Sequence, residues 1–331
     1  MSEGPYPPPG QIVPLNEANV VVGADAPAEI VGGRPSLVRT VLLENRAAMI
    51  GTIILVVTTL IAIFAGVLAP HSPTDQIGPV YAPPSSKWWL GLDDGGVDML
   101  SQMIYGARIS MIVGLAGAAV AMIIGGGVGI VSGYFGGRTD IALMRVTDYF
   151  LVIPDVPLMI VFAAVFGRSL LNIIIIIGII YWTSTARLIR AQIKSVRERV
   201  YVKRAQSIGA GHNRLIWKHV LPQVVPLLVA NTVLTIATAI FAETYIAFLG
   251  LSDPTKSSWG RLIQNSLTGG AIFHNAWWAV VPPGLAVTIV ILACTMIGQA
   301  LEDALNPRLK VGHLSVRRFR VRPFSARLDT R

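Results

Sequence analysis

The sequence has little charge and almost no cysteine. Only 14% of its 331 residues are charged and 53% are hydrophobic, with a mean hydropathy of +0.61. A soluble globular chain carries about 25% charged residues, so we predict a membrane protein. The single Cys294 lies inside an apolar run, where we expect a small packing residue. One cysteine excludes an internal disulfide framework and a thiol metal site.

Other missing patterns limit the chemistry of the chain. No Gly-x-x-x-x-Gly-Lys-Ser/Thr loop is present, so the chain is not expected to hydrolyse ATP by itself. The five histidines are scattered and form no His-Glu-x-x-His motif, which argues against a metal site. No nucleophile is spaced for a neighbouring base. We therefore expect no catalytic residue, no metal and no cofactor bound by this chain.

The two ends of the chain differ from its middle. Residues 1–36 are rich in proline and lack apolar periodicity, which predicts a disordered tail. This segment has no basic start followed by an apolar core, so it does not read as a signal peptide. Residues 311–331 form a basic tail. We assign the membrane domain to residues 37–310.

Six segments approach the ~20 apolar residues that a membrane-spanning helix needs. The sequence therefore predicts an all-α membrane protein with six transmembrane helices. The third segment is the least regular, because charges and proline interrupt it. The predicted spans are 47–69, 109–131, 141–166, 171–187, 221–249 and 278–300.

The placement of lysine and arginine predicts the orientation. All but five of the 27 basic residues lie in the two tails, the 134–145 turn and the 187–220 loop. Basic residues accumulate on the cytoplasmic side, so we expect both termini and the 187–220 loop there. The net charge of +9 then reflects orientation, with contact between the basic tail and anionic lipid as a secondary interpretation. Nucleic-acid binding is not expected.

A glycine cluster lies within the second predicted span. Gly125, Gly129 and Gly133 recur every four residues. This spacing lets two membrane helices approach closely, and we favour helix packing over phosphate binding.

The segment between the fourth and fifth spans is basic and contains a glycine turn. Residues 191–207 contain no helix breaker and are predicted to extend the fourth span. Gly209 and Gly211 permit a turn with positive φ, and Asn213 is a candidate cap for a second short helix. That helix would expose Leu215, Ile216 and Trp217, and Pro222 would begin the fifth span. The apolar side chains could rest on lipid headgroups or anchor a cytosolic partner.

This segment resembles the EAA loop of ABC importer permeases. The family pattern is Glu-Ala-Ala, a glycine four residues later and a subsequent Leu-Pro. Here these positions correspond to Lys203, Arg204, Ala205, Gly209 and Leu221-Pro222. The glycine and the Leu-Pro pair match, whereas two of the three Glu-Ala-Ala positions differ.

The resemblance extends over about residues 40–310. LGLDDGGVDMLSQMIYGARISMIVGL (90–115), MRVTDYFLVIPDVPLMI (144–160), FAETYIAFLGL (241–251), SWGRLI (258–263) and GQALEDALNPRL (298–309) are similar to dipeptide and oligopeptide permeases, C-type subunits. This implies a MetI-like permease fold in the inner membrane. It also implies a second, homologous permease, an external substrate-binding protein and two cytosolic ABC ATPases, which bind ATP and magnesium. The coupling loop, 190–222, would then be the part of this chain that docks on the ATPases.

Ionisable residues inside predicted spans require a reason, because their exposure to lipid is costly. Arg145 and Asp148 are three residues apart and are predicted to form a structural ion pair. Asp155 follows Pro154 and has no local partner. It could face the aqueous path and meet the amino group of a peptide, or bond to the sister permease. Glu243 is a candidate for either a bond between spans or a substrate contact, and we favour the former.

Two other classes of function stay open. An ion-driven secondary transporter would use broken helices with carboxylates near the membrane midplane. A membrane scaffold or receptor would transport nothing. Within the importer interpretation the solute could also be a nickel chelate, glutathione or a sugar.

Overall fold

A computed structural model describes residues 45–305, and within that range the regular structure is helical apart from isolated bridges. The predicted all-α fold is confirmed in this part of the chain. The predicted tails, 1–36 and 311–331, lie outside the described residues.

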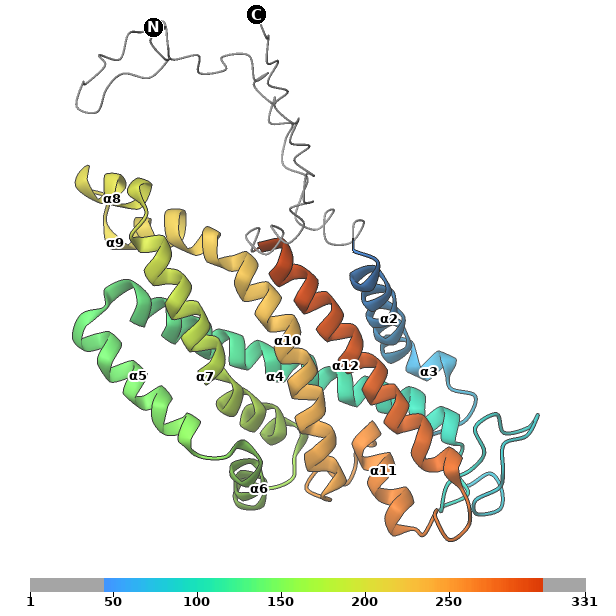
Figure 1. The fold of residues 1–331 in the computed structure, drawn as a ribbon. Coiled ribbons are helices and arrows are strands. Elements are labelled where there is room, and N and C mark those ends of the chain that lie inside the picture. The colour runs from blue at the N-terminus through green and yellow to red at the C-terminus, as the bar shows by residue number, and fades with distance from the viewer. Residues whose placement is uncertain (1–44, 306–331) are drawn as a thin grey trace, which may run out of the picture. The chain divides into compact units, whose positions relative to one another are not determined.

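Five long helices in the described range are apolar enough to cross a membrane. Figure 1 shows α2, α12, α10 and α7 running side by side, with α4 crossing behind them in this view. They correspond to five of the six predicted spans, and the first is followed by the short helix α3 (Ala65–Leu68). The long helices are α2 (Arg46–Ile63), α4 (Met99–Phe135), α7 (Leu170–Arg197), α10 (Leu221–Phe248) and α12 (Trp277–Leu305).

The third predicted span, 141–166, is not a straight helix. It consists of α5 (Gly137–Val152) and α6 (Asp155–Phe166), which meet at an angle of 89°. Ile153 is extended, with φ −80° and ψ 126°, and Pro154 follows it. Steric conflict with the proline ring disfavours helical geometry in the preceding residue. The bend therefore has a local cause in the sequence.

Side-chain caps begin several helices. The Asn45 carboxamide oxygen accepts hydrogen bonds from the Ala47 and Ala48 amides at the start of α2. Asp98 accepts from the Ser101 amide at 3.0 Å and begins α4. Ser169 performs the same role for α7, with 3.2 Å to the Asn172 amide nitrogen. These caps satisfy N–H groups that have no partner within their own helix.

The α4–α7 seam is the most extensive helix pairing of the described chain. A Cβ atom at Gly129 would lie 2.8 Å from the carbonyl oxygen of Ala186, and one at Gly133 would lie 2.8 Å from the Ile193 Cβ. The predicted packing role of these glycines is confirmed. Absence of a side chain brings the two backbones close together and increases their dispersion contacts.

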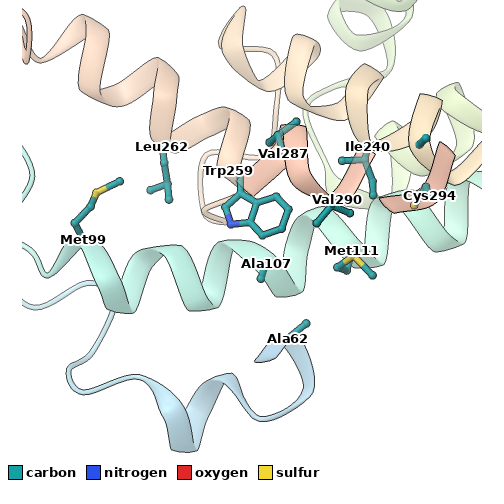
Figure 2. Close-up of a cluster of buried hydrophobic side chains, with 11 residues drawn as sticks. Ala62, Met99, Ala107, Met111, Ile240, Trp259, Leu262, Val287, Val290 and Cys294 are labelled. Carbon is teal, nitrogen blue, oxygen red and sulfur yellow. The ribbon is translucent and has the colours of Figure 1, made fainter. Parts of the chain in front are cut away.

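A second apolar cluster joins α4 to α12 through α11 (Trp259–Thr268). Figure 2 shows the Trp259 indole between Ala107 of α4 and the valines of α12. The indole nitrogen donates to the Met103 carbonyl at 3.0 Å. Cys294 lies in this cluster with no exposed surface, as expected for a packing residue.

Candidate functional site

The first candidate site is the segment that joins α7 to α10, here called the connecting segment (residues 198–220). It contains α8 (Val200–Ser207), α9 (His212–Arg214) and the π-helix η2 (Leu215–Val220). In Figure 1 it lies at one end of the bundle, beside the end of α7 and the start of α10. It occupies the position of the predicted helix–turn–helix.

The first helix of this segment is shorter than predicted. Residues 191–207 do not form one helix, because α7 ends at Arg197 and α8 begins at Val200. Arg199 between them is extended, with φ −68° and ψ 143°. The Arg197 guanidinium donates to the Tyr134 carbonyl at 2.8 Å, which ties the end of α7 to the end of α4. This contact between distant residues carries no local signal in the sequence.

The glycine turn confirms one expectation and corrects two. Gly209 has φ +86° and follows α8. Gly211 has φ −66°, so it does not use the positive region, and it precedes the first residue of α9. Asn213 lies inside α9 and caps nothing. The second helix therefore starts earlier than the predicted cap.

The three predicted apolar anchors do not share one environment. Leu215 is 1% exposed, Ile216 is partly buried and Trp217 is 66% exposed. The expectation that Leu215 is exposed is wrong. A π-helix bonds i to i+5 and adds a residue to each turn, so Leu215 and Val220 both face the core formed by α7 and α8.

The connecting segment exposes several large apolar side chains with basic residues around them. Ile208 is 86% exposed beside the glycine turn, Trp217 is exposed on η2, and Val200 and Tyr201 are exposed at the start of α8. Ile208 is not among the predicted anchors, although an isoleucine directly before a glycine turn is a recognisable signal. Ala205 is partly buried against the core, and Leu221 and Pro222 begin α10. The exposed basic residues are Arg199, Lys203, Arg204, Arg214 and Lys218.

One of these basic residues is paired locally. The Lys203 ammonium lies 2.8 Å from a Glu198 carboxylate oxygen, and both side chains are 60% exposed. Lys203 lowers the pKa of Glu198 through a hydrogen bond and through its charge. The Glu-Ala-Ala pattern has a glutamate at this position. This chain has Lys203 there instead, paired with the neighbouring Glu198.

The second candidate site is a cavity of about 500 Å³ at the bend between α5 and α6. Asp155 lies on its wall, together with Pro154 and residues of α7 and α10. One Asp155 oxygen accepts from the Val156 amide at 2.9 Å, and the other accepts from the Tyr181 hydroxyl at 3.4 Å. The structure thus places Asp155 beside an open space.

Asp148 has a different partner from the predicted one. Its carboxylate lies 2.6 Å from the Arg187 guanidinium of α7, whereas Arg145 is exposed. The predicted pair with Arg145 is therefore corrected. An i,i+3 spacing makes two side chains neighbours on one helix, but it does not exclude a better partner on another helix.

Glu243 lies away from the cavity and is 2% exposed. The Ser110 hydroxyl of α4 donates to its carboxylate at 3.3 Å, and the same serine oxygen accepts from the Trp259 amide at 3.3 Å. These contacts join α4, α10 and α11. The geometry favours the predicted bond between spans over contact with substrate.

Comparison with known proteins identifies the family. Residues 125–311 match the family described as the binding-protein-dependent transport system inner membrane component. Residues 36–84 match the N-terminal transmembrane domain of oligopeptide transport permease C.

The chain belongs to the binding-protein-dependent permease family.

Several relatives of this permease cover most of its length. It is 35% identical over 269 residues to the oligopeptide transport system permease protein OppC of Bacillus subtilis, covering 81% of this chain and 87% of the relative. It is 33% identical to the dipeptide permease DppC of the same bacterium, covering 84% and 88%. It is 32% identical to the di/tripeptide permease DppC of Pseudomonas aeruginosa, covering 81% and 90%. Together with the apolar helices, this makes it a multi-pass inner-membrane protein.

The permease also contains an ion network that the sequence analysis missed. Asp140 of α5 is buried and contacts the Arg190 guanidinium and, at 2.6 Å, the Lys194 ammonium, both on α7. The Ser132 hydroxyl of α4 donates to it as well. Arg190 and Lys194 are four residues apart and therefore share one helical face. That spacing was the only available signal, because their acidic partner lies about 50 residues away.

Proposed function

We propose that this permease is one of two membrane subunits of an ATP-driven importer of peptides. Relatives named as dipeptide, tripeptide and oligopeptide permeases support the solute class. The observation that carries the proposal is the exposure of Ile208 and Trp217 on a connecting segment that the buried Val202, Leu215 and Val220 hold against the helical core. Large apolar side chains within a charged rim are typical of the anchors of protein interfaces.

The proposed assembly has four kinds of partner around this chain. A homologous permease completes the pathway, an external binding protein delivers the peptide, and two cytosolic ATPases bind ATP and magnesium. The fourth partner is the lipid around the spans. The connecting segment lies on the cytoplasmic side in this arrangement, as the distribution of basic residues predicts.

The mechanism follows from how the connecting segment is held. Leu215 lies in one buried cluster with Ile189 and Ile193 of α7, and η2 continues directly into α10. A displacement of the segment by the ATPases is therefore passed to both α7 and α10. Nucleotide binding drives the pathway to change sides only if the ATPases bind one arrangement more tightly, by a few kcal/mol.

The test uses the exposed tryptophan of the connecting segment. In proteoliposomes that hold the whole complex, Trp217→Asp should abolish vanadate-sensitive, ATP-dependent peptide uptake, and the ATPase subunits should no longer co-purify. Trp217→Phe should retain both. A matched control is Trp89→Asp, because Trp89 is 74% exposed on the loop between α3 and α4. That variant should keep the ATPases bound. Full uptake by Trp217→Asp would refute the coupling role.

One observation favours a second candidate function. A broken span with a carboxylate beside a cavity, as at Asp155, is found in ion-driven secondary transporters. Uptake by this chain without ATPase subunits, driven by an imposed proton or sodium gradient, would support that function and refute the importer. Uptake of glutathione or a nickel chelate in place of peptides would keep the mechanism and change the solute.

A further inference from the structure

The cavity at the α5–α6 bend contains one carboxylate and no basic residue. Asp155 is its only charged lining residue among those the structure describes. The remaining walls come from the end of α5, from α7 and from α10, and they mix hydroxyl groups with apolar side chains. The other lining residues are Phe150, Leu151, Ile153, Pro154, Ile180, Tyr181, Thr183, Ser184, Asn231, Leu234, Thr235 and Thr238.

The hydroxyl protons of this lining are already used within the chain. On α7, Thr183 donates to the Ile180 carbonyl at 3.3 Å and Ser184 donates to the Tyr181 carbonyl at 3.1 Å. The Tyr181 hydroxyl itself donates to Asp155 at 3.4 Å. A hydroxyl oxygen whose proton is engaged still has lone pairs that accept hydrogen bonds.

The threonine hydroxyls on the α10 side of the lining also donate their protons to main-chain carbonyls of their own helix. Thr235 donates to the Asn231 carbonyl at 2.9 Å, and Thr238 donates to the Thr235 carbonyl at 2.9 Å. The Asn231 amide nitrogen donates to Thr185 at 2.9 Å. The cavity therefore offers acceptors from two helices, which suit a ligand that supplies N–H groups.

The charge of Asp155 has no basic partner within 4.0 Å in residues 45–305. Its two contacts are the Val156 amide and the Tyr181 hydroxyl. Arg187, a basic residue of the neighbouring α7, is engaged by Asp148. A carboxylate in a membrane-spanning region is costly unless a partner or an aqueous cavity compensates it, so the site is suited to a cation that supplies the missing charge.

We propose that this cavity is a transit site for the free α-ammonium group of a peptide, with Asp155 as its counter-ion and specificity-determining residue. The proposal rests on the proposed peptide import and names the part of the peptide that is recognised. An ammonium carries three N–H donors and a positive charge, which matches the acceptors of the lining. The volume of about 500 Å³ lies within the ~300–1,000 Å³ of small-molecule sites. A Ca²⁺ ion takes about six to eight oxygen ligands, usually with several carboxylates among them, whereas this lining supplies one carboxylate.

Thiol labelling tests the charge preference without transport or ATP. Ser184 is exposed on the cavity wall, so Ser184→Cys in a Cys294→Ala background supplies one reactive thiol. In the assembled complex in lipid nanodiscs, with labelling measured on this chain, 2-aminoethyl methanethiosulfonate should react faster than its 2-sulfonatoethyl counterpart. Asp155→Asn should reduce this ratio about tenfold, which corresponds to about 1.4 kcal/mol. Asp155→Glu should keep the ratio, and so should Asp253→Asn, which removes a carboxylate outside the lining.

Peptide protection tests the ligand. Millimolar trialanine should slow labelling at Ser184→Cys, and N-acetyl-trialanine should protect several-fold less. Asp155→Asn should remove the difference between the two peptides. An unchanged reagent ratio in Asp155→Asn, or equal protection by both peptides, would overturn the inference. If Asp155 is instead paired with a basic side chain of the sister permease, Asp155→Asn should weaken the association of the two permeases. That result would also overturn the inference.

The outcomes separate this inference from the proposed function. Uptake of peptides that is ATP-dependent and equally fast in wild type and Asp155→Asn leaves the importer intact and removes the role of Asp155. A wild-type complex that shows no peptide uptake and no protection by trialanine overturns both.

Discussion

Gly129→Ala tests whether the α4–α7 seam depends on the absence of a side chain. A Cβ at this position would lie 2.8 Å from the Ala186 carbonyl oxygen and 2.9 Å from the Ile189 Cβ. Ordinary contacts of this kind begin near 3.4 Å, so α4 and α7 would have to separate by about half an ångström at a close-packed interface. Overpacking of this kind costs ~1–3 kcal/mol.

The matched control lies two residues away on the same helix. A Cβ at Gly127 would meet nothing within 4 Å. Both substitutions gain the ~1 kcal/mol by which alanine exceeds glycine in helix propensity, and that gain cancels in the comparison. We therefore expect Gly129→Ala to be less stable than Gly127→Ala by ~1–3 kcal/mol.

The assay is a denaturant titration of the purified chain in mixed micelles, followed by tryptophan fluorescence and by helicity. Both variants are measured against wild type. Gly127→Ala should unfold at the same or a higher denaturant concentration than wild type, and Gly129→Ala at a lower one. Coincident midpoints for the two variants would refute the close-approach explanation of the seam.

Two further matched pairs test the connecting segment and the ion network. Gly209→Ser should lower the free energy of unfolding by ~1–2 kcal/mol, because φ +86° is unfavourable for a residue with a Cβ. Gly211→Ser should raise it by a few tenths of a kcal/mol, because serine caps a helix better than glycine does. Amide hydrogen exchange over residues 204–220 should rise in the first variant only. Asp140→Asn should cost ~1–3 kcal/mol, since it leaves two basic residues of α7 without their carboxylate partner at a buried position. Asp148→Asn should cost less than ~1 kcal/mol, because its pair is about half exposed, and equal shifts in the micelle titration would contradict this ranking.

The positions of five of the six spans could be predicted from the sequence, because each follows from the length of an apolar run. α10 begins at the predicted Leu221 and ends at Phe248, and α12 begins one residue before the predicted Trp278. The glycine seam was equally accessible, since a four-residue spacing fixes which face of a helix the glycines share. These features are local or periodic, and both kinds of signal are contained in short stretches of sequence.

The remaining errors concern contacts between distant elements. Asp148 selects Arg187 over Arg145 because α5 packs against α7, which no spacing within α5 reveals. Leu215 is buried because it packs into the cluster formed with α7, α8 and α10, and the composition of the short helix did not distinguish it from its exposed neighbour Trp217. Pro154 gave the position of the bend, but the 89° angle and the cavity beside Asp155 depend on how α6 packs against α7. Tertiary packing therefore decided the parts of the site that the sequence left open.

The seam between α4 and α7 also restricts which parts of the permease can slide. Backbone atoms of α7 fill the hollows at Gly125, Gly129 and Gly133, so a shift along the seam by one residue would drive a side chain into a main-chain carbonyl. The two helices therefore travel as a single body. α5 is attached to that body by ion pairs, whose long, flexible side chains tolerate small displacements, and by the contact between the Phe150 and Trp182 rings. We therefore expect relative movement to be easiest at α5, whose end forms part of the cavity wall.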